Sequence, residues 1–344
     1  MPSRRRRLAA SPRRSRPSRS GGGVSLIIRA FNEEEHIARL LTGVLQQTVR
    51  PREILLVDSG STDATLSIAR QFPVRVLRLA RSRFSFGRSL NLGCRAAHGE
   101  FLVFASAHVY PLFRDWLEKL VTPFRDPTVA LAYGKQRGDS RTRFSERQVF
   151  AQWYPETSTT RQTTPFCNNA NAAIRRRLWQ IHPFEEGTPA LEDLEWGMWA
   201  LGQGHHLAYV AQAEVAHVHR ETPAQVFNRY RREAMALKRL RPELHFGVPE
   251  LVRLVVSSGF QDARRAWGEG LFPAALREIV WFRLLQYWGT YQGFRLSGPL
   301  TDRLKKTFYY PESATDHPST LPRSAHRVEY GPAPRPAGGA KRPR

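Results

Sequence analysis

The sequence predicts an α/β protein with a mostly parallel sheet flanked by helices, followed by a helical C-terminal extension. Short apolar runs rich in Val, Ile and Leu recur over the first third of the chain, and such runs form strands that are buried on both faces. Stretches with helical periodicity separate these runs. Strands that alternate with helices of about 10 to 15 residues indicate βαβ units, and therefore a parallel sheet.

Each predicted element begins or ends at a recognisable signal. Asn32 and Glu35 have the spacing of a capping box, so they are expected to cap a helix soon after the first strand. Gly99 is expected to stop the third helix, because glycine commonly ends helices. The predicted strands cover residues 24–30, 53–58, 74–79 and 101–105, and the second and third helices cover residues 62–72 and 86–99.

The positive charge of the chain is concentrated toward its ends. The 344 residues include 53 Lys and Arg against 30 Asp and Glu, which gives a formal charge of +23. Residues 1–23 hold eight Arg and no acid, and residues 317–344 hold six basic residues against Glu329, so +23 − 8 − 5 leaves +10 between them. We expect residues 1–23 and 311–344 to be disordered tails, because they bury too little apolar surface, around a domain at 24–240 and a helical extension at 241–310.

The composition excludes several classes of protein. Two cysteines, Cys94 and Cys167, are too few for a disulfide framework or a four-cysteine zinc site, and they fit a reducing compartment. The basic N-terminal segment lacks the apolar run of a secretory signal, and no stretch of about 18 apolar residues predicts a spanning helix. We therefore expect a soluble or surface-bound intracellular protein.

Polar residues follow three of the predicted strands. Asn32 and Glu33 come after the first strand, Asp58 after the second, and residues 106–108 after the fourth. Ligands bind beyond the carboxyl ends of parallel strands, so these residues form the candidate site. The Gly-x-Gly-x-x-Gly fingerprint and the phosphate loop are absent, so a nucleotide is expected to be held in another way.

Five motifs occur in a fixed order along residues 24–240. They are IIRAFNEEEHI (27–37), ILLVDSGSTDAT (54–65), SFGRSLNLGCRAAHGEFLVF (85–104), the acidic segment 191–196 and AHVH (216–219). Their order and spacing resemble family 2 glycosyltransferases of the GT-A fold, and the third and fifth are most similar to the bacterial rhamnosyltransferase-type branch. The resemblance implies an inverting enzyme that moves a sugar from a nucleoside diphosphate, UDP or dTDP, to a glycan or lipid-linked acceptor in cell-surface polysaccharide synthesis.

The resemblance assigns the nucleoside to the segments after the first two strands. Asn32, with Glu33 or Glu34, would face the nucleoside. Asp58 would accept a hydrogen bond from the imide N–H of uracil or thymine, and Asp63 lies in the same segment. Each has a purely structural alternative: helix capping for Asn32, turn initiation for Asp58, and a place in the first turn of the next helix for Asp63.

The resemblance places Arg88, Asn91, Asn171 and Arg229 near the diphosphate and the sugar. Arg88 and Asn91 are one helical turn apart, so both can point the same way, and an arginine suits a diphosphate. The alternatives are an exposed arginine and a helix-interior asparagine at these two positions. Asn171 has turn chemistry as its alternative, and Arg229 a place on a solvated basic helix face.

The sequence departs from the family after the fourth strand, where Ser106-Ala107-His108 replaces the usual Asp-x-Asp. The family's carboxylate holds a divalent ion that neutralises the diphosphate leaving group. His217 and His219 project from one face of a strand, and in the related branch a histidine near this point completes the metal site. We therefore expect His108 and His219, with His217 as a further candidate, to hold Mn²⁺ rather than Mg²⁺, because imidazole suits transition ions. Two alternatives remain: His108 bonds the diphosphate directly with no metal, or the site has lost activity.

The acidic pair Glu192-Asp193 matches that of the family, with Asp193 as the general base that takes the proton from the acceptor hydroxyl. Its alternative is an acidic first turn, which the helix dipole favours. Trp196 lies just beyond, where an aromatic ring can stack on a sugar.

The charge of the central segment favours an anionic membrane surface as a partner. An aromatic stretch that includes Trp281, Phe282 and Trp288, with Arg277 and Arg283 beside it, is expected either at the membrane interface or in an ordinary core helix. A nucleic-acid-binding protein is the rival interpretation of the charge, but no signature of such a protein occurs, so no nucleic acid partner is expected. We expect a cytoplasmic protein attached peripherally to the inner membrane face.

Overall fold

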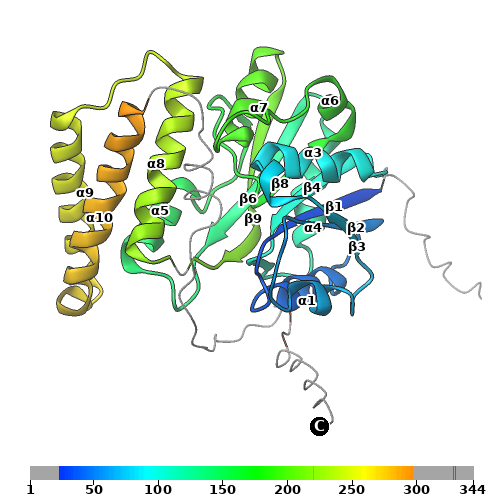
Figure 1. Cartoon of the computed structure of the whole chain (residues 1–344), viewed down its shortest axis with the longest axis horizontal. Coiled ribbons are helices and arrows are strands. Elements are labelled where there is room, and N and C mark those ends of the chain that lie inside the picture. Colours follow the sequence, from blue (N-terminus) through cyan, green and yellow to red (C-terminus); the bar gives the residue numbers. More distant parts are fainter. Residues whose placement is uncertain (1–22, 220, 297–327, 329, 331–344) are drawn as a thin grey trace, which may run out of the picture.

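The computed structural model describes residues 23–219 and 221–296, together with Val328 and Tyr330. These residues form a mixed sheet with helices on both sides and a layer of three helices at one end (Figure 1). The strand order is β3-β2-β1-β4-β8-β6-β9-β5, and β7 pairs with β9. The predicted α/β architecture is therefore confirmed, with a parallel half that joins a mixed half.

The parallel half contains the first four strands that the sequence predicts. They are β1 (Val24–Ala30), β2 (Glu53–Asp58), β3 (Arg75–Arg78) and β4 (Phe101–Ser106). β1 pairs in parallel with both β2 and β4, and Ala30 lies opposite Asp58 in the register. The carboxyl ends of β1, β2 and β4 therefore meet at one edge, where the sequence places the candidate site.

The mixed half begins at β8, which runs antiparallel to both β4 and β6. β9 runs parallel to β6 and carries β5 and β7 as antiparallel neighbours. The sequence predicts strand character only for residues 206–219 in this half. The strands are β5 (Val109–Pro111), β6 (Val129–Arg137), β7 (Thr159–Gln162), β8 (Asn171–Arg175) and β9 (His206–His217).

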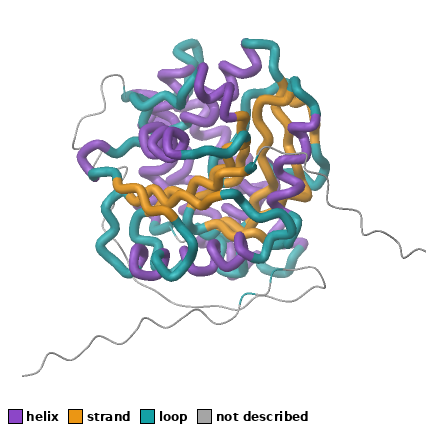
Figure 2. Tube along the Cα trace, turned by 90° about the vertical axis from the view of Figure 1, so that its right-hand side faces the viewer, coloured by secondary structure: helices purple, strands orange, loops and turns teal. Residues whose placement is uncertain are grey.

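Two apolar clusters cover the two faces of the sheet. Alternate residues of β1 point to opposite sides, so Leu26 and Ile28 belong to one cluster and Ile27 to the other. Figure 2 shows helices on both sides of the strands. Helices α1 (Ile37–Leu45) and α4 (Trp116–Val121) pack on the first cluster, and α3 (Phe86–Ala96), α6 (Arg176–Ile181) and α7 (Glu192–Gly202) pack on the second.

Several predicted helix boundaries are wrong. Asn32 does not cap α1, which begins at Ile37 after His36, because the Asn32 backbone is left-handed (φ 52°) and its side chain reaches the next loop instead. Helix α2 covers only Thr65–Ala69, and α3 ends at Ala96 before Gly99. Short 3₁₀ turns follow at Arg81–Arg83 and Thr122–Arg125.

The C-terminal layer consists of α8 (Pro223–Leu240), α9 (Val248–Gly268) and α10 (Phe272–Arg295), with α10 between the other two (Figure 1). Helix α5 (Phe144–Trp153) also contacts α9 and α10. Gly289 and Gly293 of α10 lie directly on the backbone of α8, where an added Cβ would come within 2.5 Å and 2.4 Å of carbonyl oxygens. Within the described ranges, none of the helices combines the length and apolar character that crossing a membrane requires.

Part of the predicted C-terminal tail is folded against the domain. Val328 is buried and its N–H donates to the carbonyl of Leu112, while the ring of Tyr330 packs edge-on against Tyr110. The guanidinium of Arg39 lies over the Tyr330 ring. The predicted tail at residues 1–22 and the other predicted tail residues beyond 310 lie outside the described residues, as do residues 297–310 of the predicted extension.

Candidate functional site

Asp58 occupies the carboxyl end of β2 with its carboxylate buried. Its two oxygens accept hydrogen bonds from the backbone N–H groups of Gly60 (3.0 Å) and Ser61 (3.1 Å). The carboxylate thus holds the turn after β2, as the structural alternative predicts. Since each oxygen has more than one lone pair, the fixed carboxylate can also accept from a ligand.

The loops after β1 and β2 are joined by reciprocal hydrogen bonds. Asn32 Oδ1 accepts from the Thr62 N–H (2.9 Å), and the Asn32 N–H donates to Ser61 Oγ (2.9 Å). Glu34 makes a matching exchange, because its Oε2 accepts from the Ala64 N–H (2.8 Å) and its N–H donates to Asp63 (3.1 Å). Asn32, Glu34 and Asp63 therefore shape one wall of the candidate nucleoside site.

Glu33 points in a different direction from its neighbours and reaches the turn after β4. Its Oε1 lies 2.7 Å from Nδ1 of His108. Burial lowers the pKa of His108, but the nearby Glu33 carboxylate outweighs this effect and raises the pKa above its ordinary value. Glu33 thus links the strand-end loops to the histidines.

Three histidines converge beside this contact. The rings of His108 and His217 stack with centroids 5.0 Å apart, and the His219 ring lies 4.1 Å from that of His217. Each of the three offers a nitrogen within 4.8 Å of the others. The predicted histidine cluster is therefore assembled by the fold, from the turn after β4 and the end of β9.

Each histidine is held at its Nδ1 atom by an oxygen acceptor. His217 Nδ1 lies 2.6 Å from Gln136 Oε1, and His219 Nδ1 lies 2.6 Å from Glu146 Oε1, as His108 lies near Glu33. An acceptor at Nδ1 places the ring proton there in a neutral histidine, which leaves the Nε2 lone pair available. Burial also lowers the pKa of His217 well below its ordinary value, so this ring is neutral.

The cluster fits a divalent transition ion. Neutral imidazoles whose outer nitrogens are fixed by carboxylate or amide oxygens are the usual donors for such ions. One oxygen of Glu146, Oε2, is buried and has no hydrogen-bond partner in the described part of the chain. A buried carboxylate oxygen beside His219 is a further donor suited to a cation.

Glu146 and Glu221 are site residues that the sequence did not predict. Glu146 lies on α5, far from the motifs, and no local pattern marks it. Burial alone would raise its pKa, but His219 and Arg229 lower the pKa to about 2. Glu221 follows His219 by two residues, and this spacing was an available signal.

Arg229 lies against this histidine and carboxylate network. Its guanidinium contacts Glu146 (2.8 Å) and Glu221 (2.7 Å) and is close to His219 Nδ1 (3.2 Å). Arg229 is therefore paired with carboxylates rather than on a solvated helix face. It lies beside the histidine cluster, to which it is joined through His219 and Glu146.

Arg88 and Asn91 meet a shared partner, Glu186. Arg88 Nε lies 2.6 Å from this carboxylate, and Asn91 Nδ2 lies 3.0 Å from it. Asn91 is buried, and its side chain also bonds the backbone of Phe184 and the indole of Trp179. Asn91 thus fixes the loop after α6, while half-buried Arg88 remains at the surface of that loop.

Asn171 is buried at the start of β8. Its Oδ1 accepts from Trp116 Nε1 (2.9 Å), and its Nδ2 donates to the carbonyls of Lys135 and Ala213. These hydrogen bonds connect β8 to β6 and β9. The side chain of Asn171 is therefore held in the interior of the sheet and does not reach the candidate site.

Asp193 is a buried carboxylate at the start of α7. Its oxygens accept from the backbone N–H groups of Leu194 (2.8 Å) and Asn169 (3.1 Å). Burial, together with the charge of Glu192, raises its pKa to about 7. The arrangement gives a carboxyl group that changes its charge near neutral pH.

Arg29, at the end of β1, was not predicted as a site residue. Its guanidinium lies 3.2 Å from Glu192, and its charge acts on both Asp193 and His108. Because the Ala107 N–H also donates to the Arg29 carbonyl, Arg29 connects the acidic pair to the turn that carries His108. Trp196, in contrast, is fully buried and bonds the carbonyl of His182, so the expectation that it stacks on a sugar is wrong.

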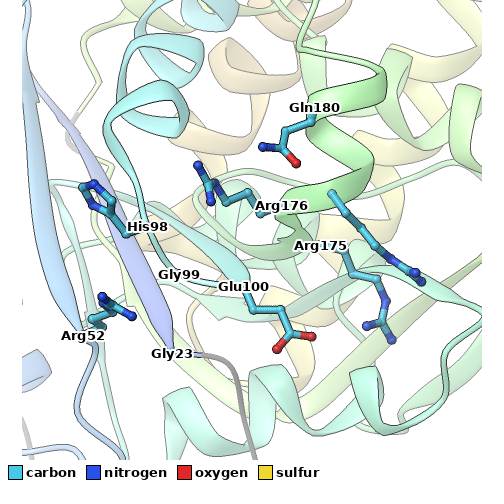
Figure 3. A pocket seen from close by; sticks show the side chains of 9 residues that line it. Gly23, Arg52, His98, Gly99, Glu100, Arg175, Arg176 and Gln180 are labelled. Carbon is cyan, nitrogen blue, oxygen red and sulfur yellow. The ribbon is translucent and has the colours of Figure 1, made fainter.

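An open pocket of about 320 Å³ lies at the other end of the parallel strands (Figure 3). It is lined by residues that precede β1 and β4, such as Gly23 and Glu100, and by Arg52, Arg175 and Arg176. The guanidinium of Arg175 donates hydrogen bonds to the carbonyls of Phe124, Asp126 and Val129. The pocket is separate from the strand-end site.

The architecture, in which a parallel half-sheet with polar loops at its carboxyl edge joins a mixed half, is that of the GT-A fold. Residues 25–181 match the family model described as Glycosyl transferase family 2, so this part of the chain is similar to that family. The resemblance of its motifs to the bacterial rhamnosyltransferase-type branch is likewise confirmed.

Two curated relatives are O-antigen chain rhamnosyltransferases. RfbN of Salmonella typhimurium strain LT2 is 27% identical over 221 residues, which are 60% of this chain and 70% of the relative. WbaN of Salmonella anatum is 29% identical over 197 residues, which are 54% of this chain and 62% of the relative, slightly less than two thirds of its length.

A solved structure shares the fold. The mannosyltransferase PcManGT from Pyrobaculum calidifontis, in complex with GDP-Man and Mn²⁺, superposes with a TM-score of 0.53 at 19% identity. The match covers 86% of this chain and 89% of that one. It extends beyond the family-model region and therefore includes part of the helical layer.

Proposed function

We propose that this protein is an inverting glycosyltransferase that moves a sugar from a nucleoside diphosphate to a glycan or lipid-linked acceptor during synthesis of a cell-surface polysaccharide. The observation that carries the proposal is the buried Asp193 carboxyl at the start of α7, whose pKa is raised to about 7 and whose neighbour Glu192 pairs with Arg29 at the end of β1. The two relatives named as O-antigen chain rhamnosyltransferases support a polysaccharide product.

Asp193 is the general base in this proposal. Inversion requires one carboxylate to take the proton of the acceptor hydroxyl while that oxygen attacks the anomeric carbon opposite the leaving group. A pKa near 7 lets the ionised carboxylate accept a proton near neutral pH. The N–H groups of Asn169 and Leu194 hold the carboxylate in a fixed orientation.

The donor is a UDP or dTDP sugar in this proposal. Asp58 accepts the imide N–H of the base, and the joined loops that contain Asn32, Glu34 and Asp63 form the wall beside the nucleoside. Arg88 and Arg229 provide positive charge for the diphosphate and sugar. Asn91 and Asn171 support the framework around them through buried hydrogen bonds.

We propose that His108, His217 and His219 hold a divalent ion, with Mn²⁺ favoured over Mg²⁺ because all three donors are imidazoles. When bound, such an ion neutralises charge on the diphosphate leaving group. Glu33, Gln136 and Glu146 orient the three rings. The Mn²⁺ in the PcManGT complex supports this proposal; the alternative is a direct hydrogen bond from His108 to the diphosphate.

The location proposed for the enzyme is the cytoplasmic side of the inner membrane, attached peripherally through the C-terminal helices. A lipid-linked acceptor would be presented at an anionic surface, which the positive charge of the chain suits.

A thermal-shift panel tests the donor and the metal together. The full chain is heated with UDP, dTDP and GDP sugars, each with and without Mn²⁺, because a ligand that binds the folded state raises the melting temperature. The proposal expects a selective shift with a uridine or thymidine donor that increases with Mn²⁺. A shift with no hydrolysis or transfer of the sugar would instead indicate a non-catalytic sugar-nucleotide binder.

A further inference from the structure

Helices α9 and α10 expose large apolar side chains at every fourth position. On α9 the valines at 248, 252 and 256 and the phenylalanine at 260 are 54% to 69% exposed, and Trp267 is 72% exposed. On α10 the same spacing continues with Leu276, Val280, Leu284 and Trp288, which are 40% to 59% exposed. Residues four apart share one face of a helix, so each helix carries an apolar stripe.

The exposed stripe overlaps only in part with the aromatic stretch that the sequence suggests for a membrane interface or a core helix. Phe282 is fully buried, and buried Arg283 forms an ion pair with Asp262 of α9 (2.7 Å). These two residues belong to the packing between the helices. Of the two alternatives that the sequence leaves open, the core helix is therefore correct for Phe282 and Arg283, whereas Trp288 and Arg277 of the same stretch are exposed.

The two stripes lie on one side of the helical layer. Helix α5 packs on the opposite side, where Arg265 bonds Gln148 and Arg283 bonds the Ser145 carbonyl. On each of the two helices, three faces follow one another around the helix axis in the same order: the face toward α5, the face toward the partner helix, and the exposed apolar stripe. Because α9 and α10 run antiparallel, this shared order places both stripes on the side opposite α5. We call the surface formed by the two stripes the outer face.

Arginine residues border the outer face. Arg253 and Arg264 of α9 and Arg277 and Arg295 of α10 are exposed. The acids of the two helices are partly withdrawn, because Asp262 is buried against Arg283 and Glu250 caps the N-terminus of α9. An apolar face with an arginine border matches the boundary between lipid headgroups and acyl chains.

We propose that the outer face binds the surface of a bilayer that contains anionic phospholipids. The apolar stripes of α9 and α10 enter the headgroup region, and the bordering arginines bind lipid phosphates. A second copy of the chain is the competing occupant, but two outer faces brought together would also bring their arginine borders together. The inference deepens the proposed function, in which the acceptor is lipid-linked, by naming the surface that meets the membrane.

The proposed contact lies one helix away from the site. Helix α10 packs backbone to backbone on α8, and α8 carries Arg229 beside the histidine cluster. A bilayer on the outer face would therefore keep the site near the membrane, although none of the described helices is suited to crossing it.

Vesicle co-sedimentation of the full chain tests the proposal. Wild type and the double variant Val256→Glu/Phe260→Glu are mixed with vesicles of phosphatidylcholine alone, or with phosphatidylglycerol added at about one third. Gln261→Glu is the control. Gln261 is also exposed on α9 but lies outside the stripe, so this substitution adds a negative charge to the same helix without changing the stripe. Wild type and the control are expected to bind the anionic vesicles, and the double variant to bind at least about tenfold less.

Circular dichroism and the donor-induced thermal shift of the double variant are expected to match those of wild type, which excludes unfolding. Equal vesicle binding by wild type and the double variant would overturn the proposal and assign the binding to the basic terminal segments. A dimer in light scattering that the double variant dissociates, with no vesicle binding, would overturn it in favour of a second copy. Transfer to a soluble acceptor is measured separately, so failure of the proposed function and failure of membrane binding give different results.

Discussion

The Nε2 atoms of His217 and His219 lie 2.9 Å apart, while the Nδ1 atom of each ring faces an oxygen acceptor. Two Nε2 lone pairs facing one another at this distance repel unless a proton or a metal cation lies with them. The pair is therefore a site at which a cation relieves an unfavourable contact. This relationship underlies the first prediction.

Replacing His219 by Ala is expected to weaken Mn²⁺ binding by at least about tenfold and to lower sugar transfer in parallel. Isothermal titration with Mn²⁺ and a transfer assay measure the two effects. His98→Ala is the control, because His98 is an exposed histidine that pairs with Glu53 away from the site. Full activity of wild type after exhaustive chelation, with no increase on adding Mn²⁺, would contradict the metal proposal and favour direct bonding by His108.

Asp193→Asn is expected to reduce turnover by about 10² to 10⁴ while donor binding stays within about twofold. The wild-type rate is expected to rise with pH and level off above about 7, because only the ionised carboxylate accepts a proton. Glu195→Gln is the control on the same helix, since Glu195 pairs with His182 outside the site. Near-normal turnover of Asp193→Asn would remove Asp193 from the role of base.

The same carboxyl group makes folding stability depend on pH. Its folded-state pKa of about 7 lies above the ordinary value of 3.8, so its contribution is fully present below about pH 4 and is lost as the pH rises through 7. The Asp193→Asn variant has no carboxyl group to ionise at this position. We therefore expect the melting temperature of the variant minus that of wild type to become larger as the pH is raised from 5 to 8. A difference that stays constant over this range would show that the raised pKa is absent.

Asp58→Asn is expected to reduce discrimination between bases as well as affinity. An acceptor at this position distinguishes uracil, whose N3 carries a hydrogen, from cytosine, whose N3 does not. Wild type is therefore expected to bind UDP at least about tenfold more tightly than CDP, and the variant to narrow this ratio. If the ratio of UDP affinity to CDP affinity is unchanged in the variant while the melting temperature falls, Asp58 does not recognise the base and only holds the turn through Gly60 and Ser61.

Asn91→Ala is expected to lower the free energy of unfolding by about 2 to 4 kcal/mol, because it leaves several buried partners without hydrogen bonds. Chemical denaturation measures this change. Arg88→Ala is the comparison, since it removes a more exposed contact to the same Glu186 carboxylate and is expected to cost less than about 1 kcal/mol. A small effect for Asn91 with a large loss of donor affinity would return it to a direct binding role.

The strands and the motif positions were predictable because they depend on local patterns. Apolar runs such as residues 24–30 form central strands wherever the chain alternates with helices, and the carboxyl ends of those strands then meet. The expected gathering of His108, His217 and His219 rested on strand periodicity, which places His217 and His219 on one face, and on the family resemblance, which relates them to the turn after the fourth strand. Short-range signals were therefore sufficient for the strands, and the resemblance was needed for the histidine cluster.

The remaining contacts depend on tertiary packing. Glu146 is 73 positions from His219, and Glu33 is 75 positions from His108, so no local spacing indicates either pair. The residue type of Asn171 does not reveal its role, because an asparagine can donate to backbone carbonyls inside the fold, as here, or to a sugar at the surface. Burial decides between these roles, and burial of a single polar residue is set by the whole fold.

The two glycines on α10 fix the position of this helix relative to α8. Gly289 and Gly293 seat α10 on the backbone of α8 with no room for a methyl group, so the two helices cannot slide or rotate past one another without a clash. The helix that carries Arg229 is therefore coupled stiffly to its neighbour. If the protein transfers a sugar as proposed, the position and tilt of the C-terminal helices would set the position of Arg229 relative to the acceptor.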